Sequence, residues 1–258
     1  MTTSTTRVSK LKRILLGCLA AAFWLAVWQL GAMALNQKIL LVSPVRVLRR
    51  LVELLPTQSF WKAIAFSFSR ITLGFLLACA AGILLGTLSA RFAAARILVT
   101  PLMSAIKSTP VASFIILVLL WVSSKNVSVV ISFLMVTPIV YLNFLGGVQS
   151  MDRELLEMTR VFRVGPLRRL RYVYVPQIMP FFRSACAAGL GLCWKAGVAA
   201  EVIGLPRGSI GEKLYESKIF LDTPDLFAWT VVIILVSLVF ERLFLYLLDL
   251  GLHRLERV

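Results

Sequence analysis

The chain has 258 residues, 59% of them hydrophobic, and its mean hydropathy is +0.87. A water-soluble protein of this length needs far more polar surface, so the composition argues against a soluble domain. The formal charge of +16 would suggest a nucleic-acid partner in a soluble protein, but here many basic residues flank long apolar blocks, where they anchor membrane helices. We therefore expect a lipid bilayer around the chain and no nucleic acid bound to it.

Six apolar blocks of about 20 residues match the thickness of a bilayer. They predict one all-α membrane domain over residues 1–258, a bundle of about six transmembrane helices, because a backbone in lipid must satisfy its own hydrogen bonds. The first block is too long for a typical secretory signal, so we expect it to remain as a helix. The spans are expected at about 13–35, 63–88, 98–122, 127–149, 176–203 and 226–248.

Between the first two blocks, residues 43–56 predict a short amphipathic helix at the outer surface. Ser43-Pro44 begins it, and apolar residues follow at helical spacing. Most loop arginines lie on the other side of the membrane, including six between Arg153 and Arg171, so we expect both chain termini in the cytoplasm. The arginines of 46–50 are an exception to this charge bias.

In the second block, small residues recur every four positions, which leaves one helix face nearly bare of side chains. This spacing predicts that another helix packs closely there. The residues are Gly74, Ala78, Gly82 and Gly86.

The segment 150–175, between the fourth and fifth blocks, combines charge with a helix break. Gly165-Pro166 interrupts a charged helical start, and Pro176 opens the next block. Such a helix–turn–helix is suited to docking in a groove on a partner; a solvated basic loop that maintains topology explains the pattern equally well. Its charged residues are Glu154, Glu157, Arg160 and Arg163.

Ionisable residues inside the blocks are candidates for a translocation pathway, because each costs a few kcal/mol in lipid unless it faces a cavity or a partner. Lys195 follows Trp194 near the middle of the fifth block, Glu201 lies six residues on, and Lys107 precedes Pro110 in the third. A cationic pathway suits an anionic solute. The alternative is that Lys195 pairs with a carboxylate of a neighbouring helix or with carbonyls at a kink.

The residues argue against an enzyme. A membrane-embedded enzyme needs clustered catalytic groups at membrane depth. Lys195 and Glu201 are the only candidates, and a spacing of six puts them on different helix faces. The four cysteines form no CxxC pair, and the single histidine lies near the C-terminus, so we expect no metal and no cofactor. A passive channel or a membrane scaffold is a further alternative from another class.

The segment 150–175 resembles the EAA loop of the permease subunits of binding-protein-dependent ABC importers. Glu157 matches the Glu of that pattern, and Val175-Pro176 matches its Leu-Pro. Met158-Thr159 replaces Ala-Ala. Arg163 stands where a Gly is expected, and we expect Gly165 to supply the turn instead.

Other segments are similar to the nitrate/sulfonate/taurine branch of these permeases, in the expected order along the chain. The matching residues are Ser43-Pro44, Ser69-Arg70, Gly74-Phe75, Gly82, Gly86, Pro101, Lys107 to Pro110, Leu120-Trp121 and Ala200 to Gly204.

The resemblance implies a type I importer permease in a bacterial-type inner membrane. It implies a cytoplasmic ATPase subunit that binds the loop, an external solute-binding protein and a permease homodimer. The chain has no Gly-x4-Gly-Lys-Ser/Thr, so ATP hydrolysis is expected in the separate ATPase subunit. The implied solute is small and anionic, with a vitamin precursor or another small solute as the alternative.

Overall fold

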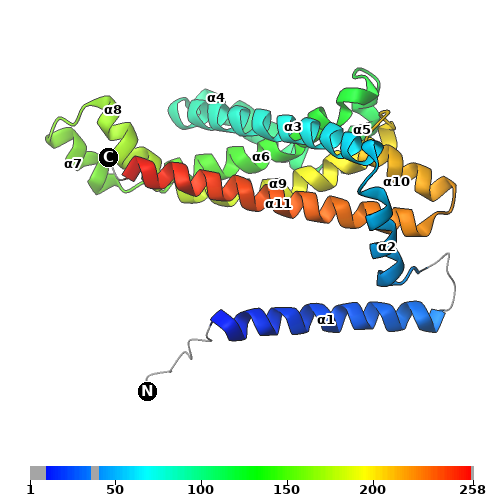
Figure 1. Cartoon of the computed structure of the whole chain (residues 1–258). Helices are drawn as coiled ribbons and strands as arrows, with labels where there is room; N and C mark the ends of the chain where they lie inside the picture. The colour runs from blue at the N-terminus through cyan, green and yellow to red at the C-terminus, as the bar shows by residue number, and fades with distance from the viewer. Residues whose placement is uncertain (1–9, 36–40, 257–258) are drawn as a thin grey trace.

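The structure, a computed structural model, describes residues 10–35 and 41–256. The expected charges of the chain ends, such as Arg7 and Arg257, lie outside the described residues. All secondary structure in the described part is helical, in agreement with the all-α prediction (Figure 1). The helices are α1 (Lys10–Leu35), α2 (Pro44–Leu54), α3 (Gln58–Arg91), α4 (Ala93–Ser108), α5 (Val111–Leu119), η1 (Ser124–Asn126), α6 (Val127–Gln149), α7 (Arg153–Val161), α8 (Pro166–Arg169), η2 (Leu170–Tyr174), α9 (Val175–Gly204), α10 (Ile210–Ile219) and α11 (Thr223–Glu256).

Five helical segments of the described chain are long and apolar enough to cross a membrane, and the number rises to six if α4 and α5 together form one span. The expected span 98–122 is therefore not one straight helix: its two parts are bent by 103°. The break lies at Thr109-Pro110, where Pro110 has no N–H to donate and holds Thr109 in an extended conformation, φ −77° and ψ 133°.

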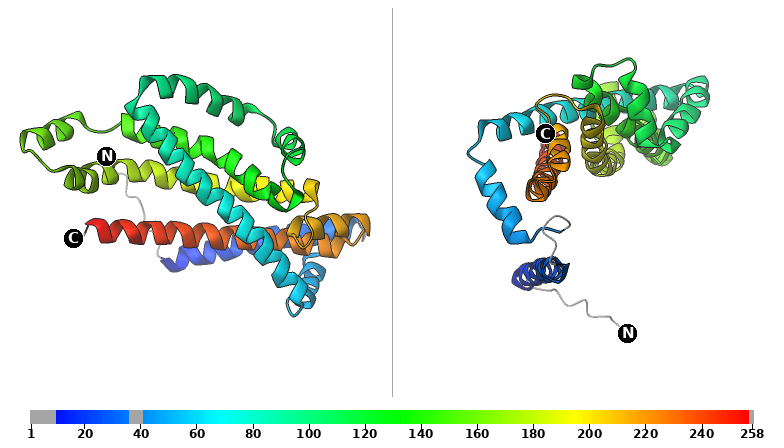
Figure 2. Two further views of the ribbon diagram at one scale, coloured as in Figure 1. Left: turned by 90° about the horizontal axis from the view of Figure 1, so that it is seen from above. Right: turned by 90° about the vertical axis from the view of Figure 1, so that its right-hand side faces the viewer.

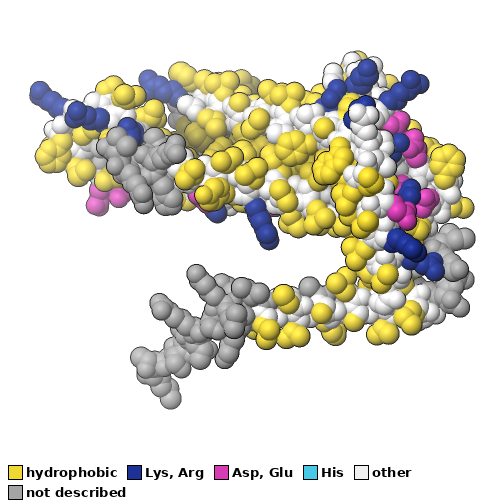
Figure 3. Space-filling view, viewed as in Figure 1, with side chains coloured by type: hydrophobic (Ala, Val, Ile, Leu, Met, Phe, Trp, Pro, Cys, Tyr) yellow, Lys and Arg dark blue, Asp and Glu magenta, His cyan; other side chains and the backbone are white. Residues whose placement is uncertain are grey.

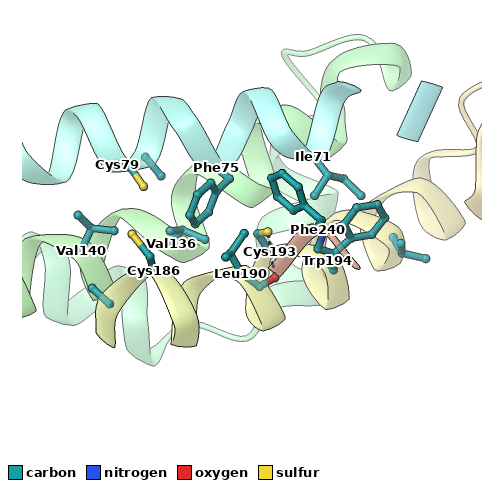
Figure 4. Packing of buried hydrophobic residues seen from close by; sticks show 13 residues of the cluster. Ile71, Phe75, Cys79, Val136, Val140, Cys186, Leu190, Cys193, Trp194 and Phe240 are labelled. Atoms are coloured by element: carbon teal, nitrogen blue, oxygen red, sulfur yellow. Dashed lines mark hydrogen bonds between the residues drawn. The ribbon is translucent and has the colours of Figure 1, made fainter. Parts of the chain in front are cut away.

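The core of the bundle lies between α3, α6 and α9, with one face of α11 packed against it. Figure 4 shows side chains from all four helices meeting there, among them Phe75 of α3, Val136 of α6, Leu190 of α9 and Phe240 of α11. These side chains are apolar and buried against the neighbouring helices, and their burial holds the four helices together.

The small residues of α3 explain why α6 lies so close to it. A Cβ added at Gly82 would stand 2.7 Å from the Cβ of Val140, and one at Gly86 would stand 2.7 Å from the Phe144 ring. A Cβ at Gly74 would collide with the backbone oxygen of Val129. Ala78 is fully buried in the same core. The bare face of α3 is thus covered by α6 of the same chain.

The two ends of the bundle differ. One end carries α7, α8 and the C-terminal end of α11; the other carries α2, α5 and α10 (Figures 1 and 2). The helix α1 lies apart from the bundle and meets it near α2, where Trp28 packs on Phe227 of α11 with ring centroids 5.7 Å apart. Within the described chain, the apolar window of α1 is 0% buried and that of α11 is 11% buried, so both present apolar surface outward.

Candidate functional site

The segment between α6 and α9 projects from one end of the bundle (Figure 1). Asp152 caps α7: its carboxylate accepts a hydrogen bond from the Glu154 backbone N–H at 2.9 Å, which satisfies one of the free donors of the first turn. The side chains of Glu154, Glu157 and Arg160 are exposed along α7, while Thr159 is buried. The charged residues of the segment thus share an accessible helix.

The turn after α7 is made by Arg163, which has a left-handed conformation with φ 51°. The Arg163 N–H donates to Arg160 O at 3.1 Å, and the Val164 N–H donates to Thr159 O at 2.9 Å. This is the type of helix end that glycine usually occupies. The expectation that Gly165 supplies the turn is wrong: Gly165 is extended, with φ −60° and ψ 152°, and precedes α8. The turn must come where α7 ends, and Arg163 is at that position.

The tip of this segment exposes large apolar side chains beside its charges. Val161, Phe162 and Leu167 are 73–78% exposed. Large apolar groups on a projecting, charged segment are typical of a surface that another protein covers. The segment is also tied to the bundle, because the Asp152 N–H donates to Gln177 Oε1 at 2.8 Å, and Gln177 Nε2 donates to Val173 O. Pro176 is the second residue of α9, which continues directly from the π-turn η2 (Leu170–Tyr174), so its missing N–H falls where the regular α-helical bonding is already interrupted.

The structure separates the ionisable candidates of the fifth span. Lys195 is exposed on α9 and takes part in none of the ion pairs found among the described residues. Its face of the helix is lined by small residues, including Ala188 and Gly191, and nothing lies within 4 Å of a Cβ added at Gly191. Trp194, by contrast, is buried in the core of the bundle. Lys107 is exposed near the end of α4, a different helix from the one that carries Lys195.

Glu201 is fully buried, and its surroundings form a small polar cluster. The Ser67 hydroxyl donates to Glu201 Oε2 at 2.6 Å, and the Gly211 backbone N–H donates to the same oxygen at 3.3 Å. The Ile210 N–H in turn donates to Ser67 Oγ at 3.0 Å. The carboxylate therefore joins α9 to α3 and to the N-terminal turn of α10. Its place in the pathway stays a prediction, and in this structure the side chain is enclosed by these three helices.

Two sets of contacts were not anticipated from the sequence. Ser67 and Gly211 became recognisable only because the fold brings them to Glu201. Arg183 of α9 makes a two-pronged ion pair with Asp249 of α11, at 2.7 and 3.0 Å. The signal available in the sequence was Asp249, an acidic residue directly after the apolar block 226–248, since a carboxylate at the edge of a span needs a partner to be stable there.

Comparison with known proteins places these features in a family. Residues 82–252 match the family described as binding-protein-dependent transport system inner membrane component, and the chain belongs to it. The protein is thus the permease subunit of an ABC importer, a family in which ATP hydrolysis takes place in a separate subunit.

Two relatives indicate the branch of the family. The chain is 25% identical to a putative aliphatic sulfonates transport permease of Bacillus subtilis, over 86% of this chain and 80% of that one. It is 25% identical to the taurine transport system permease of Escherichia coli, over 89% of this chain and 82% of that one. A crystal structure of an amino acid ABC transporter superposes with a TM-score of 0.52 at 19% identity, covering 76% of this chain and 97% of the other, and supports the fold.

Proposed function

We propose that two copies of this chain form the translocation pathway for a small anionic solute, and that a cytoplasmic ATPase drives it through α7 and α8. The observation that carries the proposal is the projecting segment 150–175. It combines exposed charges on α7 with exposed apolar side chains at its tip, which is what docking on a partner requires. Delivery of the solute by an external binding protein follows from membership of the family.

The arginines at the two ends of the bundle support one orientation of the chain in the membrane. Figure 3 shows Lys and Arg side chains gathered mostly at the two ends, with hydrophobic side chains covering the flank. The end with α7 and α8 includes Arg153, Arg160 and Arg163, and we assign it to the cytoplasm. The end with α2 and α10 then faces outward, and both termini lie inside.

An anionic solute is supported by the exposed cations and by the relatives. Lys195 lies in a membrane span without an ion-pair partner among the described residues, and Lys107 is exposed near the bend between α4 and α5. Each would attract a negative charge. The two relatives named above transport compounds that carry a sulfonate group.

A second copy of the chain is supported by the uncovered helices. The apolar windows of α1 and α11 are almost unburied within one chain, and α1 lies apart from its own bundle (Figure 2). A homodimer would give these surfaces a protein partner in addition to lipid.

The experiment is purification of the tagged protein from its native membrane in a mild detergent, with identification of what accompanies it. We expect an ATPase subunit in a defined ratio to the permease, and a solute-binding protein whose bound ligand names the substrate. Recovery of the folded chain alone, in repeated preparations, would contradict the proposal and favour a passive channel or a scaffold.

A further inference from the structure

The helix α2 has three distinct faces. One is packed against α11 and includes Pro44 and Val47, both buried. A second consists of apolar residues that nothing in the described chain covers: Val45, Leu48 and Val52 are 60–68% exposed. The third carries Arg46 and Arg49, both exposed. A helix with an apolar face beside a basic one is typical of a helix that lies in a membrane interface.

The position of α2 agrees with that reading. It lies at one end of the bundle and runs crosswise to the long membrane helices (Figures 1 and 2). Trp61, at the start of α3, is 56% exposed and donates from its indole nitrogen to Leu55 O at 2.9 Å. Tryptophan is enriched at the level of the lipid head groups, so Trp61 marks the depth at which α2 lies.

Arg50 holds α2 in this position. Its Nε donates to Asp225 Oδ1 at 2.9 Å, and the Ser217 hydroxyl donates to the other oxygen of Asp225 at 2.8 Å. Burial by itself lowers the pKa of Arg50, but the hydrogen bond and charge of Asp225 outweigh it and leave that pKa above its ordinary value. A third contact, to Glu53 at 3.3 Å, completes the set. The charge of Arg50 is therefore already paired with carboxylates of this chain, Asp225 and Glu53.

Arg46 and Arg49 have no such partner in the described residues. They border a pocket of about 330 Å³ whose other lining residues are Arg50, Glu53, Asp222 and Pro224. Glu53 bonds Arg50, and Asp222 Oδ1 accepts the Asp225 N–H at the start of α11. The two acids thus have partners within the chain, and the two exposed arginines are available to an outside anion.

We propose that Arg46 and Arg49 bind the phosphate of a membrane phospholipid, while Val45, Leu48 and Val52 insert among its acyl chains. One guanidinium group can donate two parallel N–H···O hydrogen bonds to two oxygens of a phosphate, a geometry that lysine lacks. The apolar face favours a lipid over a protein as the source of the anion. It lies next to the arginines on the same helix, and the chain is embedded in a bilayer, so one phospholipid can contact both faces. Assignment to the outer leaflet rests on the proposed orientation; the lipid site itself does not.

The first test measures the depth of α2 in liposomes with nitroxide spin labels at Leu48→Cys and, separately, at Arg49→Cys. The exposed Cys18 is first replaced by alanine, since Cys79, Cys186 and Cys193 are buried. We expect the Leu48 label to be relaxed by oxygen, which dissolves in the acyl region, and the Arg49 label by a water-soluble nickel complex. Equal access of the nickel complex to both labels would place α2 in water and overturn the proposal.

The second test counts phospholipids that stay bound to the detergent-purified protein, by native mass spectrometry with added phosphatidylglycerol. The double substitution Arg46→Gln with Arg49→Gln should weaken lipid retention about 25-fold, because each basic side chain near a membrane surface contributes about fivefold. Arg207→Gln is the matched control, an exposed arginine in the loop before α10.

Unchanged lipid retention in the double variant would overturn the proposal. If the variant lost the external binding protein instead, the arginines would belong to a protein-docking surface. Copurification of the ATPase depends on the opposite end of the molecule, so failure of the lipid site is distinguishable from failure of the proposed function.

Discussion

At the scale of single residues, Arg163 has a left-handed backbone conformation, φ 51°, which is unfavourable for any residue with a Cβ. A left-handed backbone at a residue with a Cβ costs about 1–2 kcal/mol, and glycine avoids that cost while adding some freedom to the unfolded chain. We expect Arg163→Gly to stabilise the protein by about 0.5–1 kcal/mol, measured as a higher Tm in detergent.

The matched control is Gly165→Ala. Gly165 has a negative φ, and nothing lies within 4 Å of an added Cβ. Its Tm should not fall, and the loss of freedom in the unfolded chain should raise it slightly. A fall in Tm for Gly165→Ala together with no rise for Arg163→Gly would contradict the assignment of the turn.

Glu201 is predicted to act through the position of α10. Replacement by alanine leaves the Ser67 hydroxyl and the Gly211 N–H buried without their acceptor, and each such loss costs about 1–3 kcal/mol. We expect Glu201→Ala to lower the stability by about 2–4 kcal/mol. Glu201→Gln keeps an oxygen acceptor at the same place and should lower it less. Equal stability of the alanine and glutamine variants would show that the hydrogen bonds contribute nothing.

At the scale of the elements, the close packing of α3 on α6 depends on glycine. A methyl group at Gly82 would overlap Val140, and such overpacking typically costs about 1–3 kcal/mol. Gly82→Ala should therefore lower the thermal stability. Gly146→Ala is the control, because Gly146 is a helical glycine of α6 with open space around it, and alanine is the better helix former. A stabilised Gly82→Ala variant would mean that the two helices can move apart freely.

The helix α7 is predicted to carry the contact with the ATPase through charge. Glu157→Lys should weaken ATPase binding by about 2–5 kcal/mol, the range for loss of a buried charge contact at an interface, without reducing insertion or Tm. The neutral variant Glu157→Gln should bind the ATPase more weakly than the natural protein does and more tightly than Glu157→Lys does. Binding is measured by copurification and by transport-coupled ATP hydrolysis. Full assembly and transport with Glu157→Lys would contradict the coupling role.

At the scale of the whole molecule, the pathway is predicted to include Lys195. Lys195→Met should reduce uptake of the anionic solute by about tenfold or more, equivalent to about 1.4 kcal/mol, because it removes the positive charge from an exposed face of α9. Lys195→Arg keeps the charge and is the control. The measurement is uptake with coupled ATP hydrolysis in reconstituted vesicles. Unchanged uptake by the methionine variant would exclude a role for this charge.

The sequence was sufficient for the class of fold and for the membrane. Apolar blocks of spanning length leave the chain no other stable environment, and a continuous apolar block of about 20 residues satisfies its own backbone hydrogen bonds in lipid as a helix. The resemblance in segment 150–175 indicated the family, because Glu157 and Pro176 belong to one continuous stretch of sequence and their spacing of 19 positions can be read without knowledge of the fold. Local periodicity likewise located the bare face of α3.

Other features depended on contacts between residues distant in the sequence, and only the tertiary structure decided them. Ser67 lies 134 positions from Glu201, and Arg183 lies 66 positions from Asp249. The hydropathy of the sequence predicts which residues lie within the membrane, but it does not predict which side of each helix contacts a neighbouring helix. The same physical reason explains Lys195 and Glu201: both are ionisable residues of one span, and packing against α3 and α10 buries one while the other remains exposed.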